Sequence, residues 1–211
     1  MKKSIILLFV SGTLLSIACE SADYELEKSV YMPDKEHSGL PAYSEWGYNT
    51  FGAFYERKVF IYNNNEVPAK VIHTGGLSRF ILKGGLAPPD YNDYYYNGYN
   101  YYTSVMSLSF DLPGFHPDNY TDLIQLNDTI FDLSLPDNRV FAVIGTDTVD
   151  MDVFNGRLQF KRAQHLYVDG EPMKVILSGF FGFQALVQGE PISVSYGRFD
   201  LSIDEYDFAN Y

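Results

Sequence analysis

The chain has 211 residues, a formal net charge of −12, and 27 acidic against 15 basic residues. Its length suits one domain that buries a core without cross-links, and its single cysteine excludes an internal disulfide. The acidic balance excludes nucleic acids as partners, because the chain and a phosphate backbone repel each other. Aromatic residues make up 17% of the chain, which favours pleated sheets.

The N-terminus has the parts of an export signal. Lys2 and Lys3 precede an apolar stretch, Ile5 to Ile17, and Cys19 follows it. About 13 residues are too few for the ~20 of a bilayer-spanning helix, so residues 1–18 are expected to be a cleaved signal peptide. The cysteine at the cut resembles the lipidation site of bacterial lipoproteins, although Ser16 stands where those signals usually carry leucine. The resemblance implies that Cys19 carries acyl chains such as palmitate. The alternative is an ordinary residue beside a secretion cut.

Residues 19–39 are rich in acidic side chains and lack apolar periodicity, which predicts a solvated tether. Acidic residues directly after a lipidated cysteine resemble the surface-export signal of Bacteroidetes lipoproteins. That resemblance implies an outer-membrane lipoprotein exposed at the cell surface, and the alternative is one that faces the periplasm. The β domain is expected at residues 40–211.

Strand patterns dominate this domain. Three segments alternate with a period of two residues, which indicates half-buried strands: Val105–Leu112, Val175–Gln184 and Arg198–Ile203. Only residues 118–125 are expected to form a short helix. No internal repeat is present.

Turn residues separate the strands. Asn155-Gly156 and Asp169-Gly170 suit tight hairpins, because both central positions of a type I′ turn favour positive φ. Gly84-Gly85 is a further candidate turn. Short strands with such turns predict an all-β fold, a single antiparallel β-sandwich, with a closed calycin-like β-barrel as the alternative.

Several motifs resemble, in the same order, those of a group of uncharacterised Bacteroidetes lipoproteins. They are Leu40-Pro41, Asn49-Thr50-Phe51-Gly52, Thr129–Leu133, Gly156–Phe160, Leu177–Phe183 and Val194–Asp200. The resemblance spans nearly all of residues 40–203 and implies an antiparallel β fold on a lipid anchor. It implies no activity, because the function of those proteins is unknown. Gly52, Gly179 and Gly197 within these motifs predict bulges or close packing rather than ligand contact.

A tyrosine-rich segment follows Pro88-Pro89. Its candidate ligand-contact residues are Tyr91, Tyr94, Tyr95, Tyr96 and Tyr99, interspersed with asparagine, aspartate and glycine. Tyrosine offers a rigid aromatic face and a hydroxyl at low entropic cost, which suits a recognition loop for glycans. The alternative is a long hairpin whose tyrosines cover neighbouring strands.

No catalytic signature is present, and we expect neither enzymatic activity nor a cofactor. Asp147, Asp150 and Asp152 lie close to Asn155-Gly156, but their spacing does not fit a calcium loop and favours a solvated turn. The four histidines are far apart in sequence and form no zinc motif, so no metal is expected. Two of the many carboxylates could still meet across a cleft for sugar hydrolysis.

Two further sites resemble the Asp-Ser/Thr-apolar motif at which Bacteroidetes O-glycosylate exported proteins. They place the candidate acceptors at Thr129 and Thr148. The combined expectation is a lipid-anchored, non-enzymatic binding or accessory protein of the cell envelope, with a glycan or an envelope protein as its partner. The alternatives are a small hydrolase of envelope glycans and a purely structural envelope component.

Overall fold

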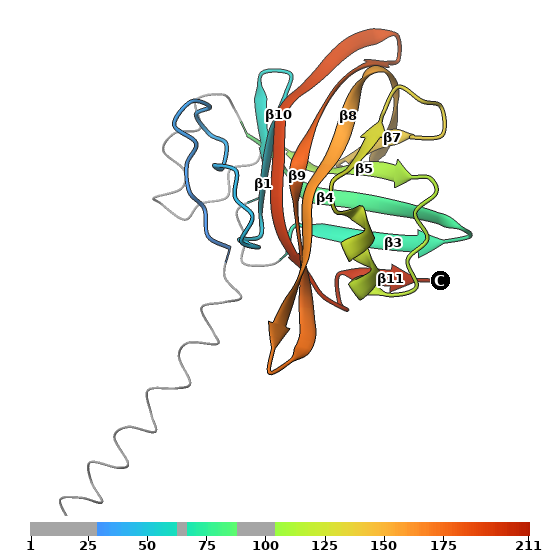
Figure 1. Ribbon diagram of the computed structural model, residues 1–211. Helices are drawn as coiled ribbons and strands as arrows, with labels where there is room; N and C mark the ends of the chain where they lie inside the picture. Colours follow the sequence, from blue (N-terminus) through green and yellow to red (C-terminus); the bar gives the residue numbers. More distant parts are fainter. Residues whose placement is uncertain (1–28, 63–66, 88–103) are drawn as a thin grey trace, which may run out of the picture.

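The computed structural model describes residues 29–62, 67–87 and 104–211 (Figure 1). Cys19, the signal peptide, residues 19–28 of the expected tether and the candidate tyrosines Tyr91 to Tyr99 lie outside the described residues. Within the described ranges, no helix is long and apolar enough to cross a membrane.

The fold is all-β and antiparallel, and eight of its strands close into a barrel in the order β4-β2-β1-β10-β9-β8-β7-β5. Pairing of β5 with β4 completes the ring. The predicted all-β antiparallel class is confirmed, and of the two architectures left open the structure has the closed barrel, not the sandwich. The elements are β1 (Thr50–Tyr55), β2 (Lys58–Ile61), β3 (Ala69–Thr74), β4 (Leu77–Ala87), β5 (Ser104–Leu112), η2 (Tyr120–Leu126), β6 (Thr129–Asp132), β7 (Val140–Ile144), β8 (Asp147–Val168), β9 (Glu171–Val187), β10 (Glu190–Ile203) and β11 (Phe208–Asn210).

Three strands lie beside the ring. One edge of β4 pairs first with β3 and then with β2, and β11 adds to β3 in parallel. Strand β6 continues the edge of β8 beyond its pairing with β7. The expected short helix is present as the 3-10 helix η2, which buries Leu123 and Leu126 in the core.

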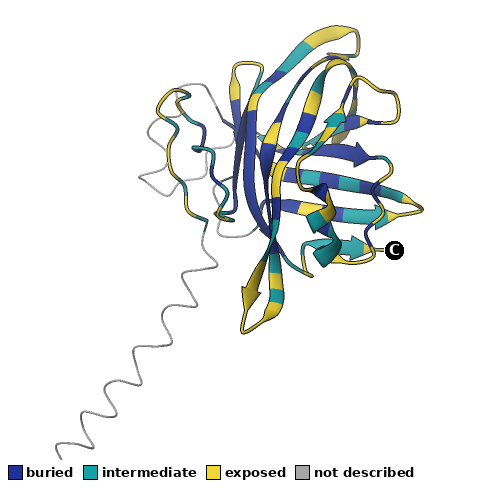
Figure 2. Cartoon of the chain, viewed as in Figure 1, coloured by how far each residue is buried: buried dark blue, intermediate teal, exposed yellow. Residues whose placement is uncertain are grey.

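Phenylalanine rings fill the barrel interior. Phe80 on β4 contacts Phe160 on β8 and Phe199 on β10, with ring centroids 5.3 and 5.2 Å apart. These strands belong to opposite walls, so rings meet across the barrel axis at this level. Of these three rings only Phe199 lies in a segment whose alternation is predicted from the sequence, and Figure 2 shows buried residues along the barrel strands. Burial of such side chains, at ~25 cal/mol per Å² of apolar surface, is the main force that closes the sheet.

Of the three turns predicted above at Asn155-Gly156, Asp169-Gly170 and Gly84-Gly85, one is present and two are not. Asp169-Gly170 joins β8 to β9 with φ values of 52° and 87°. Asn155-Gly156 and Gly84-Gly85, however, lie inside β8 and β4. At these positions glycine serves close packing, because a Cβ on Gly156 would lie 2.3 Å from the Phe183 Cβ, and one on Gly84 would lie 2.4 Å from the Ile61 carbonyl oxygen.

Residues 29–49, here called the strap, run over the outside of β9 and β10. The Asp200 carboxylate on β10 accepts backbone N–H bonds from Trp46, Gly47 and Tyr48 at 3.2, 2.7 and 3.2 Å. It also accepts the Ser44 hydroxyl, and Asp200 is only 1% exposed. A buried charge is tolerated only when hydrogen bonds replace its hydration, and the strap supplies them.

A second charged contact secures the strap on the same strand. The Arg198 guanidinium pairs with Asp34 and donates to the Pro41 carbonyl oxygen at 3.4 Å. Partial burial alone would raise the pKa of Asp34, but the backbone N–H groups of His37 and Glu36 and the Arg198 charge lower it to about 2. Residues 29–39, which the sequence analysis places in the tether, therefore pack against the barrel.

Replacing Gly179 on β9 tests the packing of rings against glycine. A Cβ at this position would lie 2.0 Å from the Gln159 carbonyl oxygen and 2.7 Å from Phe199 Cζ. We expect Gly179→Ala to lower the free energy of unfolding by about 3 kcal/mol, at the upper end of overpacking costs. Urea denaturation measures the change. Gly182→Ala is the control on the same strand, since its Cβ meets only the Val194 carbonyl oxygen at 3.3 Å. Equal effects of the two variants would contradict this account.

Replacing Asp200 tests the strap anchor. Asp200→Ala leaves three strap N–H groups without their acceptor, and we expect a loss of about 3 kcal/mol in the free energy of unfolding. Release of the strap should also speed trypsin cleavage after the exposed Lys35. Asp137→Ala, in an exposed turn, controls for the loss of a charge. A strap that stays protease-resistant in Asp200→Ala would argue against this anchor.

Candidate functional site

A groove of about 790 Å³ lies on the outside of the barrel across β6, β8, β9 and β10. Its lining mixes amide, charged, hydroxyl and aromatic side chains around two glycines. The residues are Ile130, Asp132, Ser134, Asn155, Gly156, Arg157, Gly182, Phe183, Gln184, Ser193, Val194, Ser195 and Tyr196. We refer to it as the β9 groove.

The β9 groove lies on β9 beyond the part of the strand that the strap covers. In the N-terminal half of β9 the strap covers the outward side chains of Ile176 and Ser178, which are 4% and 0% exposed. Farther along the strand no strap residue covers Gly182 and Gln184, and Gly182 contributes no side chain to the floor. The groove forms because the strap does not cover this part of β9 and because Gly182 has no side chain.

An irregularity in β10 forms one wall. The register with β9 shifts between Val194 and Gly197, and Tyr196 adopts a φ of 53°. Bulges of this kind redirect a side chain, and the Tyr196 ring is 58% exposed at the groove. Ile130 on β6, 58% exposed, also lines it. The hollow therefore has an aromatic and an aliphatic surface beside its polar floor.

Polar groups in the groove offer both donors and acceptors. Asn155 Nδ2 donates to Gln184 Oε1 at 3.3 Å, which holds two amides side by side across β8 and β9. The hydroxyl and backbone N–H of Ser134 donate to Asp132 Oδ1 and keep the pKa of that carboxyl below its usual range. Arg157 stands opposite Asp132 in the β6–β8 register. Amide, guanidinium and carboxylate groups beside an aromatic ring match the hydroxyls and apolar face of a sugar.

A second hollow of about 660 Å³ continues from Ser134 and is lined by Asp150 and Asp152, two of the three aspartates considered for calcium. Asp150 there pairs with Arg139 at 2.9 Å, and Asp147 and Asp152 also belong to strand β8. Among the described residues, no group of three or more acidic, histidine or cysteine side chains could hold a metal ion. The expected solvated turn at these residues is wrong, because they belong to β8.

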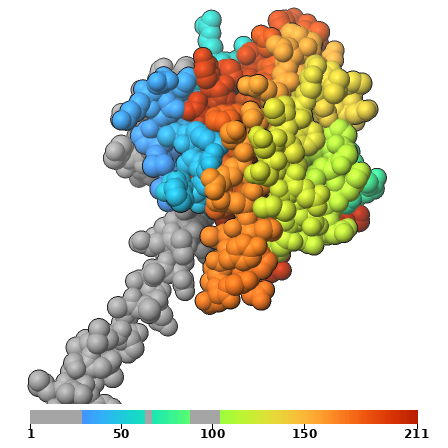
Figure 3. Space-filling view, viewed as in Figure 1, coloured from blue at the N-terminus to red at the C-terminus, as the bar shows by residue number. Residues whose placement is uncertain are grey.

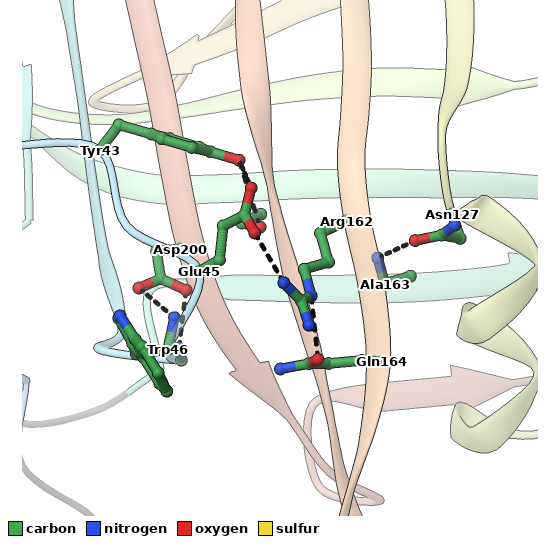
Figure 4. A network of polar contacts seen from close by, with 10 residues as sticks. Tyr43, Glu45, Trp46, Asn127, Arg162, Ala163, Gln164 and Asp200 are labelled. Carbon is green, nitrogen blue, oxygen red and sulfur yellow. Dashed lines mark hydrogen bonds and ion pairs between the residues drawn. The ribbon is translucent and has the colours of Figure 1, made fainter.

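A polar network ties the strap to β8 (Figure 4). Tyr43 donates to Glu45 Oε1 at 2.9 Å, and Arg162 Nη1 contacts Glu45 Oε2 at 3.0 Å. Burial, with the neighbouring carboxylates, raises the pKa of Tyr43 to about 12 despite its contact with Ser178. Arg162, together with Tyr43, lowers the pKa of Glu45. A carboxylate held ionised by an arginine cannot serve as a proton donor, so this network positions the strap.

Two carboxyl groups do meet, but away from the groove. Asp204 and Asp207 lie in the turn between β10 and β11, where Tyr206 N and Asp207 N both bond to Asp204. Burial raises the pKa of Asp207 to about 6, and the Asp204 charge adds to the shift. Eight residues of β10 separate this pair from Tyr196, roughly 25 Å at strand spacing. The geometry therefore does not place paired carboxylates at the β9 groove.

The candidate glycosylation sites differ in access. Thr129 is half-buried, and its hydroxyl donates to the Leu126 carbonyl oxygen at 2.7 Å. Thr148 is exposed on β8.

His73 and His116, distant in sequence, lie with their rings 5.7 Å apart, and His73 Nδ1 also contacts Ser78 Oγ.

None of the groove residues was singled out as a ligand contact from the sequence. The alternation in Val175–Gln184 was a usable signal, because it places Gly182 and Gln184 on the outward face.

No family model matches the chain, and no curated protein or solved structure is significantly similar to it.

The Asp204–Asp207 pair predicts a pH-dependent stability. An aspartate whose pKa is higher in the folded chain stabilises the fold when protonated, so this contribution is full below about pH 4 and is lost as the pH rises through about 6. Asp207→Asn removes the charge, and we expect it to raise the free energy of unfolding by about 1 kcal/mol at about pH 7.5, after discounting for solvent screening. At about pH 4 the variant and the natural chain should be nearly equal in stability.

Urea denaturation at the two pH values measures this difference. Asp137→Asn controls for the change in net charge, since Asp137 is exposed in a turn. An Asp207→Asn effect of the same size at both pH values would show that the carboxyl pair does not titrate as described.

Proposed function

We propose that this protein is a lipid-anchored, non-enzymatic binding protein of the bacterial cell envelope that holds a glycan in the β9 groove. The observation that supports the glycan most directly is the composition of the groove. A glycine floor lies next to the exposed Tyr196 ring, and Asn155 and Gln184 present paired amides. Such a site contacts both the apolar face and the hydroxyls of a sugar.

Charge narrows the class of glycan. Asp132 and Arg157 face each other in register in the groove, so the site itself is close to neutral. The whole chain carries a formal charge of −12, which repels strongly anionic polymers. We infer a neutral saccharide rather than an acidic one.

The N-terminal sequence supports the proposed lipid anchor at Cys19. A short apolar run ending at Cys19 resembles a lipoprotein signal, and the ordered motifs resemble uncharacterised Bacteroidetes lipoproteins. With acyl chains on Cys19 the protein would be anchored in the outer membrane. The acidic residues that follow Cys19 favour exposure at the cell surface, and the alternative is a protein that faces the periplasm. Two or more acyl chains are needed for a stable anchor.

A glycan hydrolase is the weaker alternative. It needs two carboxyl groups about 5 to 9 Å apart at the scissile bond. The close pair, Asp204 and Asp207, lies at the far end of β10 from the groove. If the groove binds no ligand, a purely structural role in the envelope is the remaining alternative.

Glycan arrays of neutral saccharides test the proposal, with isothermal titration on any hit. Gln184→Ala is expected to weaken binding about tenfold, the cost of one hydrogen-bonding side chain in a site. Gly182→Leu should abolish binding, because its side chain would occupy the groove floor. Gln125→Ala, on the exposed face of η2, is the matched control.

The tyrosine segment supplies the rival site. If Tyr94, Tyr95 and Tyr96 bind the glycan, replacing all three by alanine removes binding while Gly182→Leu retains it. That pattern would overturn the groove assignment and keep the binding function. Absence of binding by the natural chain to any saccharide would argue for the structural role instead.

A further inference from the structure

The β8–β9 hairpin extends beyond the barrel as two strands alone. Strand β10 ends where Ile203 pairs with Val175, and β6 leaves β8 at Phe160. From there β8 and β9 pair only with each other, out to Val168 opposite Glu171. The free part is about 15 Å long at strand spacing. Figure 2 shows this projection as mostly exposed, and Figure 3 shows its end projecting from the body.

The projecting tip carries apolar side chains that are about half exposed in the described chain. Leu166, Tyr167, Val168 and Met173 are 39%, 58%, 51% and 51% exposed. A two-stranded hairpin gains little stability on its own, and clustered exposed apolar residues mark an interaction surface. Asp169 lies in the turn of the hairpin and Glu171 follows it, so the tip also carries two acidic groups.

The chain's only tryptophan lies at the base of this hairpin. Trp46 is 72% exposed, although its backbone N–H is fixed by Asp200. The next residue, Gly47, packs against Ile176, which pairs with Gln164 at the start of the hairpin. Figure 4 shows Trp46 at the level of Gln164, on the side where the strands run on towards the tip.

The described part of the chain also begins at the end of the barrel from which the hairpin projects. The Ser29 hydroxyl donates to the Asn49 carbonyl oxygen at 3.1 Å. The Asn49 side chain accepts the Ser202 backbone N–H at 2.8 Å, and Ser202 pairs with Ile176. Any anchor that precedes Ser29 is therefore attached at the end of the barrel from which the hairpin projects.

We propose that Trp46, Leu166, Tyr167, Val168 and Met173 form a membrane-facing rim that seats the barrel on the interface of a zwitterionic bilayer. The inference rests on the proposed lipidation of Cys19. Roughly ten residues join Cys19 to Ser29 and span at most about 35 Å, which exceeds the length of the hairpin and lets the tip reach the bilayer. Trp and Tyr favour the headgroup level, while Asp169 and Glu171 disfavour anionic lipids.

This orientation has a consequence for the β9 groove. Arg157 in the groove lies ten residues of β8 from Tyr167 at the rim, roughly 30 Å along the strand. A barrel seated on its rim holds the groove well away from the lipid surface, where a polymer can reach it.

Fluorescence of Trp46 tests the rim, because it is the only tryptophan in the chain. The full chain, expressed and processed in a bacterium, is reconstituted into phosphatidylcholine vesicles with or without brominated acyl chains. We expect a blue-shifted Trp46 emission that brominated lipid quenches, and salt should not weaken the quenching. Tyr167→Ser combined with Met173→Ser should reduce it. Phe154→Ser removes an equally exposed ring, 56%, near the other end of β8 and should leave it unchanged.

Mass spectrometry of the same preparations separates this inference from the proposed function. A chain lipidated at Cys19 whose Trp46 is not quenched would overturn the rim and leave the anchor in place. A chain without acyl groups on Cys19 would overturn the anchor, and the rim with it. Quenching that Phe154→Ser reduces as strongly as the hairpin variant does would also contradict the rim, because the contact would then not be specific to this end.

Discussion

The buried carboxylate of Asp200 is the interaction on which the outer surface of this protein depends. Three successive strap N–H groups and the Ser44 hydroxyl converge on it, from residues more than 150 positions earlier in the chain. Its burial would be unfavourable without them, so strap and barrel must form together. The docked strap seals the outside of β9 over Ile176 and Ser178 and fixes the backbone of Trp46. The β9 groove lies farther along β9, beyond the part of the strand that the strap covers.

The inside of the barrel follows from a pairing of glycine with phenylalanine. Gly179 leaves room for the Phe199 ring, and Gly197 leaves room for Phe181, because a Cβ at either glycine would lie within 3 Å of that ring. Inward glycines therefore admit rings large enough to meet across the axis, and such rings make a dense core without a disulfide. On the outward face of β9, Gly182 has the opposite effect. No ring fills its space, and the strand is hollow there.

Alternation in the sequence predicted β5, the middle of β9 and the end of β10 as strands. It could not separate sandwich from barrel, because both alternate identically along each strand and differ only in whether β5 pairs with β4. Asn155-Gly156 was misread as a turn because local chemistry does not reveal that Phe183 crosses that glycine. The groove draws on four strands, so no single sequence window contains it. The Asp200 contacts were hidden for the same reason: their partners are close only after folding.

The long strand β8 relates the two proposed surfaces to each other. Its middle, at Asn155 to Arg157, lines the β9 groove, and its C-terminal end leaves the barrel as a hairpin beside Trp46. A two-stranded extension is a costly place for Tyr167 and Val168, since the barrel core gains nothing from them there. In the proposed arrangement lipid covers these side chains, and the ordered strap, which links the rim to β10 through Asp200 and Arg198, transmits the orientation to the groove. The acidic charge of the chain then has a simple use, because it keeps the remaining surface away from anionic polymers and membranes while apolar contacts alone fix the rim.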